Sequence, residues 1–143
     1  MMNPKDEISV TEYQALAEFR YQLRRFLRFS EQAARAAGLE PQQHQLLLAV
    51  KGSPEGRKAT ISALAERLQL AHHSTVELVD RLTERGFIQR CRGEGDQRWV
   101  FVTLTSQGEE ALRNLSLAHR AELQSTGPAL VQALTLLLSK NNS

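Results

Sequence analysis

Apolar residues recur at spacings of three and four over residues 11–37, a stretch that contains no proline or glycine. This period predicts one long amphipathic helix, and Gly38 directly after it is a typical C-terminal stop. At 1.5 Å per residue the helix would be about 40 Å long, more than a compact monomer of this size easily covers. Its surplus apolar face therefore predicts packing against another chain.

The middle of the chain predicts three shorter helices. The first follows Pro41 and ends at a loop rich in glycine and proline over residues 52–56. We expect its buried side to hold Leu46, Leu47, Leu48 and Val50. Two more helices are predicted over residues 60–70 and 72–85, with a tight turn between them. The last of these would turn Thr75, Leu78, Val79 and Leu82 inward. Such a helix-turn-helix pattern is weak evidence when it stands alone.

Alternating apolar and polar residues follow this pair of helices. Residues 87–92 and 98–104 alternate, and residues 93–96 supply a turn, so a β-hairpin is predicted. A helix-turn-helix followed by a hairpin is a winged helix-turn-helix. The fold class we expect is mainly α with a small β-hairpin wing, flanked by N- and C-terminal helices.

The end of the chain predicts two further helices. Thr105 is placed to cap the first of them, with Glu109 and Glu110 in a first turn where negative charge suits the helix dipole. We expect this helix to reach about Ser125, and Gly127 and Pro128 to begin a last helix through Leu138. Its apolar stripe again exceeds what a monomer needs.

Composition excludes several classes of protein. The chain has 143 residues, of which 41% are hydrophobic and 24% charged, as expected for one globular domain. No apolar run approaches the roughly 20 residues of a membrane span, and no signal peptide is recognisable, so we expect a cytoplasmic location. The single cysteine, Cys91, excludes an internal disulfide and a multi-cysteine zinc site. No catalytic motif is present, and we expect neither enzymatic activity nor a cofactor.

The net charge is only +2, but the arginines are clustered. One group lies in the first predicted helix and a second at the predicted hairpin, where local charge steers a polyanion better than the net charge suggests. The members are Arg20, Arg24, Arg25, Arg28 and Arg35 in the helix, and Arg90, Arg92 and Arg98 at the hairpin.

Five short motifs follow one another in order between Leu64 and Gly108. They read LAERL (64–68), LVDRL (78–82), ERGFIQR (84–90), DQR (96–98) and VTLTSQG (102–108). Their order and spacing resemble the MarR family of winged helix-turn-helix transcription regulators, and the resemblance extends over residues 1–143 as one protomer. It implies a homodimer held together by residues 11–37 and 105–140. Residues 41–104 would then form the winged helix-turn-helix.

The resemblance also implies a mode of binding to double-stranded DNA. Residues 72–85 would be the recognition helix in the major groove, and Arg98 would enter the minor groove, braced by Asp96. A two-fold dimer would read a pseudo-palindromic operator whose half-sites lie roughly 34–36 Å apart. The residues expected to contact DNA are His72, His73, Ser74, Val76, Glu77, Arg81, Arg90, Arg92 and Arg98.

The sequence departs from the family pattern at three places. Ala71 stands where serine or threonine is frequent, which weakens the cap of the recognition helix. Glu77 stands where a basic residue is common. A carboxylate there repels phosphate but accepts a hydrogen bond from cytosine, so we expect an unusual base preference. The wing reads Asp-Gln-Arg at residues 96–98 in place of Asp-Arg-Arg, which removes one basic group.

Members of the family bind small molecules, often aromatic or phenolic, between the dimer helices and the DNA-reading part. The candidates here are Tyr13, Arg20, Tyr21, Arg24 and His44, with Phe19 and Phe26 nearby. Aromatic rings beside arginines would hold an anionic aromatic ligand, which predicts a repressor released by such a ligand. The alternative is that these rings form dimer core and the arginines are solvated.

Two other sites have alternatives that stay open. Adjacent residues point about 100° apart on a helix, so His72 and His73 are poor joint metal ligands, and no metal site is expected. Cys91, between two arginines, is either a reactive thiol or an ordinary strand residue. For the whole chain, the alternative to a DNA-binding regulator is a winged helix that docks protein, and the basic wing favours DNA.

Overall fold

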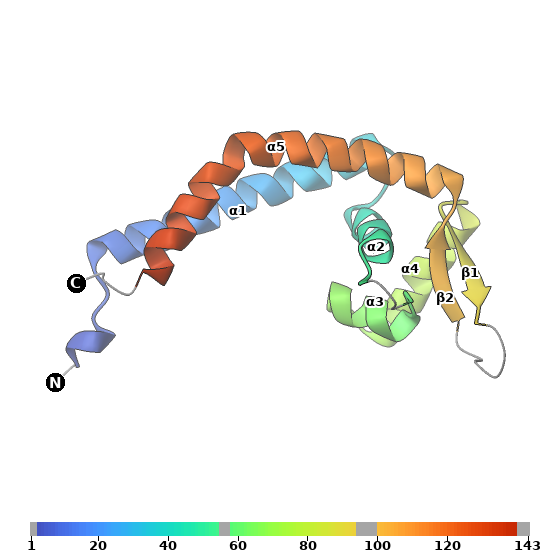
Figure 1. Cartoon of the computed structure of the whole chain (residues 1–143), viewed down its shortest axis with the longest axis horizontal. Coiled ribbons are helices and arrows are strands. Elements are labelled where there is room, and N and C mark those ends of the chain that lie inside the picture. The colour runs from blue at the N-terminus through green and yellow to red at the C-terminus, as the bar shows by residue number, and fades with distance from the viewer. Residues whose placement is uncertain (1–2, 55–57, 94–99, 140–143) are drawn as a thin grey trace. The chain divides into compact units, whose positions relative to one another are not determined.

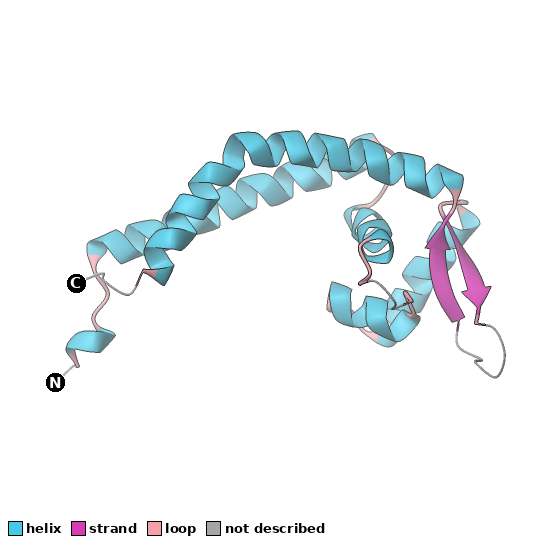
Figure 2. Ribbon diagram, in the orientation of Figure 1, coloured by secondary structure: helices cyan, strands magenta, loops and turns pink. Residues whose placement is uncertain are grey.

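The computed structural model describes residues 3–54, 58–93 and 100–139. After a short 3-10 helix the chain forms five α-helices and one hairpin within these ranges (Figures 1 and 2). They are α1 (Val10–Ala36), α2 (Pro41–Lys51), α3 (Ile61–Leu68), α4 (His72–Glu84), β1 (Ile88–Arg92), β2 (Val100–Leu104) and α5 (Ser106–Leu138). The predicted class, mainly α with a small β-hairpin wing, is confirmed.

The chain divides into two compact units. The first comprises Met1–Gln32 with Leu117–Ser143, and the second is Ala33–Ser116. Both long helices therefore contribute residues to each unit. The second unit contains α2, α3, α4 and the hairpin, so it is the winged helix-turn-helix.

Local sequence signals explain where the helices of the second unit begin and end. Gly38 takes φ +81° after α1, as its expected role as a stop requires. The Thr60 hydroxyl accepts a hydrogen bond from the Ala63 N–H (3.2 Å) and caps α3. Gln69 turns the chain in the left-handed conformation, at φ 54°. Ala71 gives α4 no side-chain cap, as predicted.

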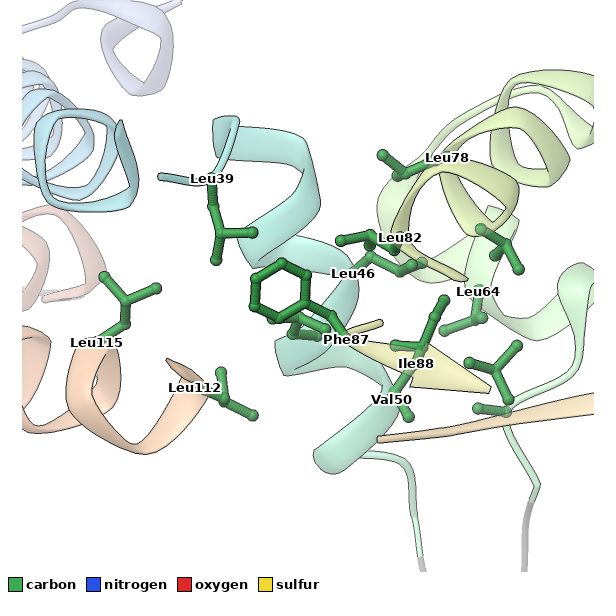
Figure 3. Packing of buried hydrophobic residues seen from close by; sticks show 14 residues of the cluster. Leu39, Leu46, Val50, Leu64, Leu78, Leu82, Phe87, Ile88, Leu112 and Leu115 are labelled. Atoms are coloured by element: carbon green, nitrogen blue, oxygen red, sulfur yellow. The ribbon is translucent and has the colours of Figure 1, made fainter. Parts of the chain in front are cut away.

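A cluster of buried hydrophobic side chains, mostly aliphatic with the ring of Phe87 among them, holds the second unit together (Figure 3). It draws on α2, α3, α4, both strands and the start of α5. The inward residues predicted for α4, Thr75, Leu78, Val79 and Leu82, are all buried. The prediction for Leu48 was wrong, because this residue is 46% exposed. Three consecutive helical residues span too wide an arc to face one core, and α2 buries Gln43, Leu46, Leu47 and Val50 instead.

The hairpin is antiparallel, with Ile88 opposite Leu104 and Arg92 opposite Val100. Val102 is buried, and its N–H donates to the carbonyl of Ala59 (2.9 Å). This bond ties β2 to the segment just before α3. The predicted turn residues from Glu94 onward lie outside the described residues.

The predicted break between two C-terminal helices was wrong. Gly127 and Pro128 lie inside α5, which runs as one continuous helix (Figure 1). Proline lacks the N–H that would bond the carbonyl four residues earlier, a defect that usually ends a helix. Beyond the proline Ala133 is buried, at 3% exposed, whereas Val131, Leu134 and Leu138 are exposed. The helix therefore continues across the proline with little packing of its last turns within the chain.

The start of α5 packs directly against Gly86 and Phe87, the two residues just before β1. The Thr105 hydroxyl donates to the carbonyl of Gly86 (2.6 Å) and accepts from the Gly108 N–H (3.1 Å), which confirms Thr105 as a cap. A Cβ atom added to Gly108 would lie 2.0 Å from the carbonyl oxygen of Phe87. Glycine is therefore required at this position by the close approach of two backbones.

We expect Gly108→Ala to lower the free energy of unfolding by about 2 kcal/mol, as overpacking typically does. Gly127→Ala is the control, because it lies in the same helix and its added Cβ would meet no atom within 4 Å outside the adjacent residues. It should change the free energy of unfolding by less than about 1 kcal/mol, because the gain in helix propensity is opposed by Pro128, which disfavours the helical conformation of a preceding residue that carries a Cβ. Urea unfolding measures both. Equal stabilities would contradict the steric argument.

Candidate functional site

The face of α4 turned away from the core is rich in charged and polar side chains. Because Thr75, Leu78, Val79 and Leu82 fix the opposite face, the exposed side is set by the helix geometry. It carries His72, His73, Glu77, Asp80, Arg81 and Glu84. Ser74 and Val76, also predicted to contact DNA, are half-buried at its margin.

The N-terminus of α4 has backbone N–H groups that no side chain caps, because Ala71 has no acceptor. Such groups, together with the positive end of the helix dipole, favour an anion. The two exposed histidines, His72 and His73, stand in this first turn. The first turn of α4 therefore suits contact with a polyanion, although the middle of the helix carries Glu77 and Asp80.

Asp80 forms an ion pair with Arg90, which joins the exposed face of α4 to β1. The side chains are 51% and 38% exposed, so the pair is screened by solvent. Sequence reasoning placed Arg90 among the DNA contacts and did not single out Asp80. The sequence carries no signal for this pair, because Glu77 and Glu84 lie on the same face and have no ion-pair partner among the described residues.

Arg85, at the end of α4, was also missed. Its guanidinium donates to Gln43 Oε1 (2.9 Å) and to the carbonyl of Gly38 (2.7 Å), and it lies 5.0 Å from the centroid of the Phe87 ring. These contacts join the end of α4 to the start of α2. No spacing rule connects residues that are 42 and 47 positions apart in the chain.

A groove of about 430 Å³ separates the exposed face of α4 from the start of α2. Arg81 lines it, and among the described residues its guanidinium has no hydrogen-bond or ion-pair partner. The other lining residues are Glu40, Pro41, Gln42, Gln43, Ser74, Glu77 and Leu78. Arg81, the single arginine of α4, is thus available to an external anion.

Arg92, at the end of β1 in the hairpin, is exposed to solvent. Cys91 is half-buried, with its Sγ 3.5 Å from Thr103 Oγ1 on the other strand. Asp96 and Arg98, the predicted wing pair, lie outside the described residues. Their roles stay predictions.

The candidate ligand residues belong to different units. Tyr13, Arg20, Tyr21 and Arg24 are exposed along α1 in the first unit, and Arg25 lies 5.6 Å from the centroid of the Tyr21 ring. Phe19 and Phe26 are half-buried, and Phe26 contacts His119 edge-on (5.8 Å between centroids). His44 belongs to the second unit and is 2% exposed.

Within residues 3–54, 58–93 and 100–139, no group of three histidine, cysteine, aspartate or glutamate side chains is placed to hold a metal ion. In the same ranges, none of the helices has the length and apolar character that crossing a membrane requires.

Comparison with known proteins gives a consistent result. Residues 37–98 match the sequence model of the MarR family. The HTH-type transcriptional regulator YfiV of Bacillus subtilis (strain 168), itself uncharacterised, is 36% identical over 55 residues. That match covers 38% of this chain and 34% of YfiV, so the chain spans about a third of this relative's length.

Solved structures share the fold. The MarR family regulator AbsC from Streptomyces coelicolor has a TM-score of 0.67 at 22% identity, over 84% of this chain and 80% of AbsC. FabT from Streptococcus pneumoniae, solved in complex with DNA, has a TM-score of 0.67 at 20% identity, over 79% of this chain and 80% of FabT. Identities this low establish the fold of the chain and nothing about its ligands.

We expect a coupling free energy of about 0.5 kcal/mol between Asp80 and Arg90, as is typical of exposed ion pairs. A double-mutant cycle with Asp80→Asn and Arg90→Gln, followed by urea unfolding, measures it. High salt should reduce the coupling. The control cycle pairs Glu84→Gln with Arg90→Gln and should give none, because Glu84 has no partner among the described residues. If both cycles gave the same coupling free energy, the ion pair of Asp80 with Arg90 would contribute nothing specific to stability.

Proposed function

We propose that this chain, whose residues 37–98 match the sequence model of the MarR family, is a transcription regulator that binds double-stranded DNA sequence-specifically. The observation that carries the proposal is the exposed first half of α4, fixed on a buried core and free of a side-chain cap. The DNA complex of FabT, which has the same fold, supports this use of the fold.

The dimensions and chemistry of α4 suit the major groove of DNA. That groove admits an α-helix and presents a different pattern of donors and acceptors for each base pair. His72, His73 and Glu77 supply exposed polar groups for base edges, with Ser74 and Val76 beside them. The uncapped N–H groups and Arg81 supply contacts to phosphates, which fix position without reading sequence.

The hairpin would provide the second contact. Arg92 extends from the end of β1, and we place Arg98 in the minor groove with Asp96 as its brace. Arg90 is engaged by Asp80, so we assign it to holding the wing against α4 more than to phosphate.

We further propose that the protein acts as a homodimer through its first unit. Large apolar side chains of α1 and α5 are exposed in the isolated chain, including Val131 at 64%. Others are Val10, Tyr13, Leu16, Leu27, Leu117, Leu123, Leu134, Leu136 and Leu138. An apolar surface this extensive is typical of a face covered by another protein. A second copy would provide that cover and a second DNA-reading head.

The regulatory part of the proposal is a repressor released by a small anionic aromatic molecule. Tyr13 and Tyr21 offer ring faces, and Arg20 and Arg24 offer guanidinium groups for a carboxylate or phenolate. His44 is 2% exposed, so a ligand bound to these exposed residues would not contact its ring in the conformation described.

Binding to the DNA upstream of the protein's own gene tests the central claim. We expect fluorescence anisotropy to show a preference of about 10³ or more over a scrambled duplex of equal length, with two protomers per duplex. Affinity should fall linearly with the logarithm of salt concentration. Arg98→Ala should weaken binding, whereas Arg113→Ala, an exposed arginine in α5, is the charge-matched control. Absence of binding at low salt would reject the proposal and favour a protein-docking module.

A panel of phenolic and aromatic carboxylic acids, titrated into that complex, tests the regulatory claim. We expect at least one compound to weaken DNA binding about tenfold, within the usual range of allosteric coupling. The double variant Arg20→Ala/Arg24→Ala should lose this response while keeping its affinity for DNA without ligand. Arg28→Ala, one turn further along α1, should respond normally. A full response in the double variant would remove these arginines from the ligand site.

A further inference from the structure

The exposed face of α4 carries three carboxylates, Glu77, Asp80 and Glu84. They differ in what they contact. Asp80 is neutralised by Arg90. For Glu77 and Glu84, the part of the chain that the structure describes offers neither a hydrogen-bond donor nor an ion-pair partner. Glu77 is therefore an available acceptor in the first half of α4, one turn after His73.

This position gives Glu77 a specific chemistry if α4 enters the major groove, as the proposed function requires. A carboxylate only accepts hydrogen bonds. The edges of guanine and thymine present acceptors there, and adenine presents an acceptor, N7, beside its amino group. Cytosine presents only the N4 amino donor. A carboxylate is thus repelled least, and bound best, where a cytosine stands.

From this geometry we infer that Glu77 is a specificity-determining residue that selects a cytosine in each half-site of the operator. The inference rests on the proposed function and deepens it. Asp80 cannot take this role while it holds Arg90. Glu84 lies at the C-terminal end of α4, two turns beyond Glu77 and away from the end that enters the groove first.

The same carboxylate weakens binding to every sequence, because it lies close to phosphates when the helix docks. That penalty does not depend on the base pair, whereas the bond to cytosine does. A wrong base leaves the carboxylate without a donor and next to acceptors, which is a repulsive element against incorrect sites. Glu77 therefore raises the ratio of specific to non-specific binding more than it raises affinity.

Selection of random duplexes by the full-length protein, read out by sequencing, tests the inference. The wild type should enrich a C·G pair at one position in each half-site, by about tenfold over other pairs, the order expected of one good base contact. Glu77→Gln should shift that position towards adenine, whose N6 and N7 suit a glutamine amide. Glu84→Gln removes the same charge from the same face and should keep the cytosine.

Each outcome is decisive. A cytosine that persists at that position with Glu77→Gln would overturn the inference and leave the proposed function intact. A shift that also occurs with Glu84→Gln would overturn it too, because a general change of charge would then be the cause. Enrichment of no sequence by any of the three proteins would reject the proposed function and this inference together.

Discussion

The packing of α4 against the aliphatic cluster of the second unit is the constraint on which the proposed site depends. Leu78, Val79 and Leu82 are held among side chains from α2, α3 and the hairpin. This packing fixes the rotation of α4 about its axis, and so decides which residues are presented outward. The contact of Gly108 with Phe87 and the bonds of Arg85 to Gln43 and Gly38 hold the C-terminal end of α4 in place. A helix that presents its side chains to a ligand in a fixed orientation needs such support.

Much of this fold could be predicted from sequence, because periodicity reports which face of an element is buried. The spacing of three and four placed α1, α3 and α4, and alternation placed the hairpin. Prediction failed where the folded chain departs from a local signal. Pro128 is a strong local stop, yet α5 continues through it. Leu48 is apolar, yet it points away from the core.

For the candidate site, the sequence predicted which elements form it but not the contacts of its charged side chains. Motif order identified α4 and the hairpin, and the exposed face of α4 followed from the same periodicity. The contacts of Asp80 and Arg85 did not follow, because each joins elements whose relative placement only the folded chain defines. Charged side chains carry no period of their own, so a sequence cannot show which of them are neutralised. Asp80 is neutralised by Arg90, whereas Glu77 has no ion-pair partner among the described residues, and the sequence does not show this difference.

The two long helices have a consequence for how such a protein diversifies. Because α1 and α5 each belong to both units, no linker exists in either helix at which the winged helix could be cut out and exchanged. Recombination inside either helix would damage both units at once. If the proposed function holds, a new DNA preference would be acquired by substitutions on the outer face of α4, while the choice of partner would change separately on α1 and α5. Such substitutions would leave the buried scaffold of the second unit as it is.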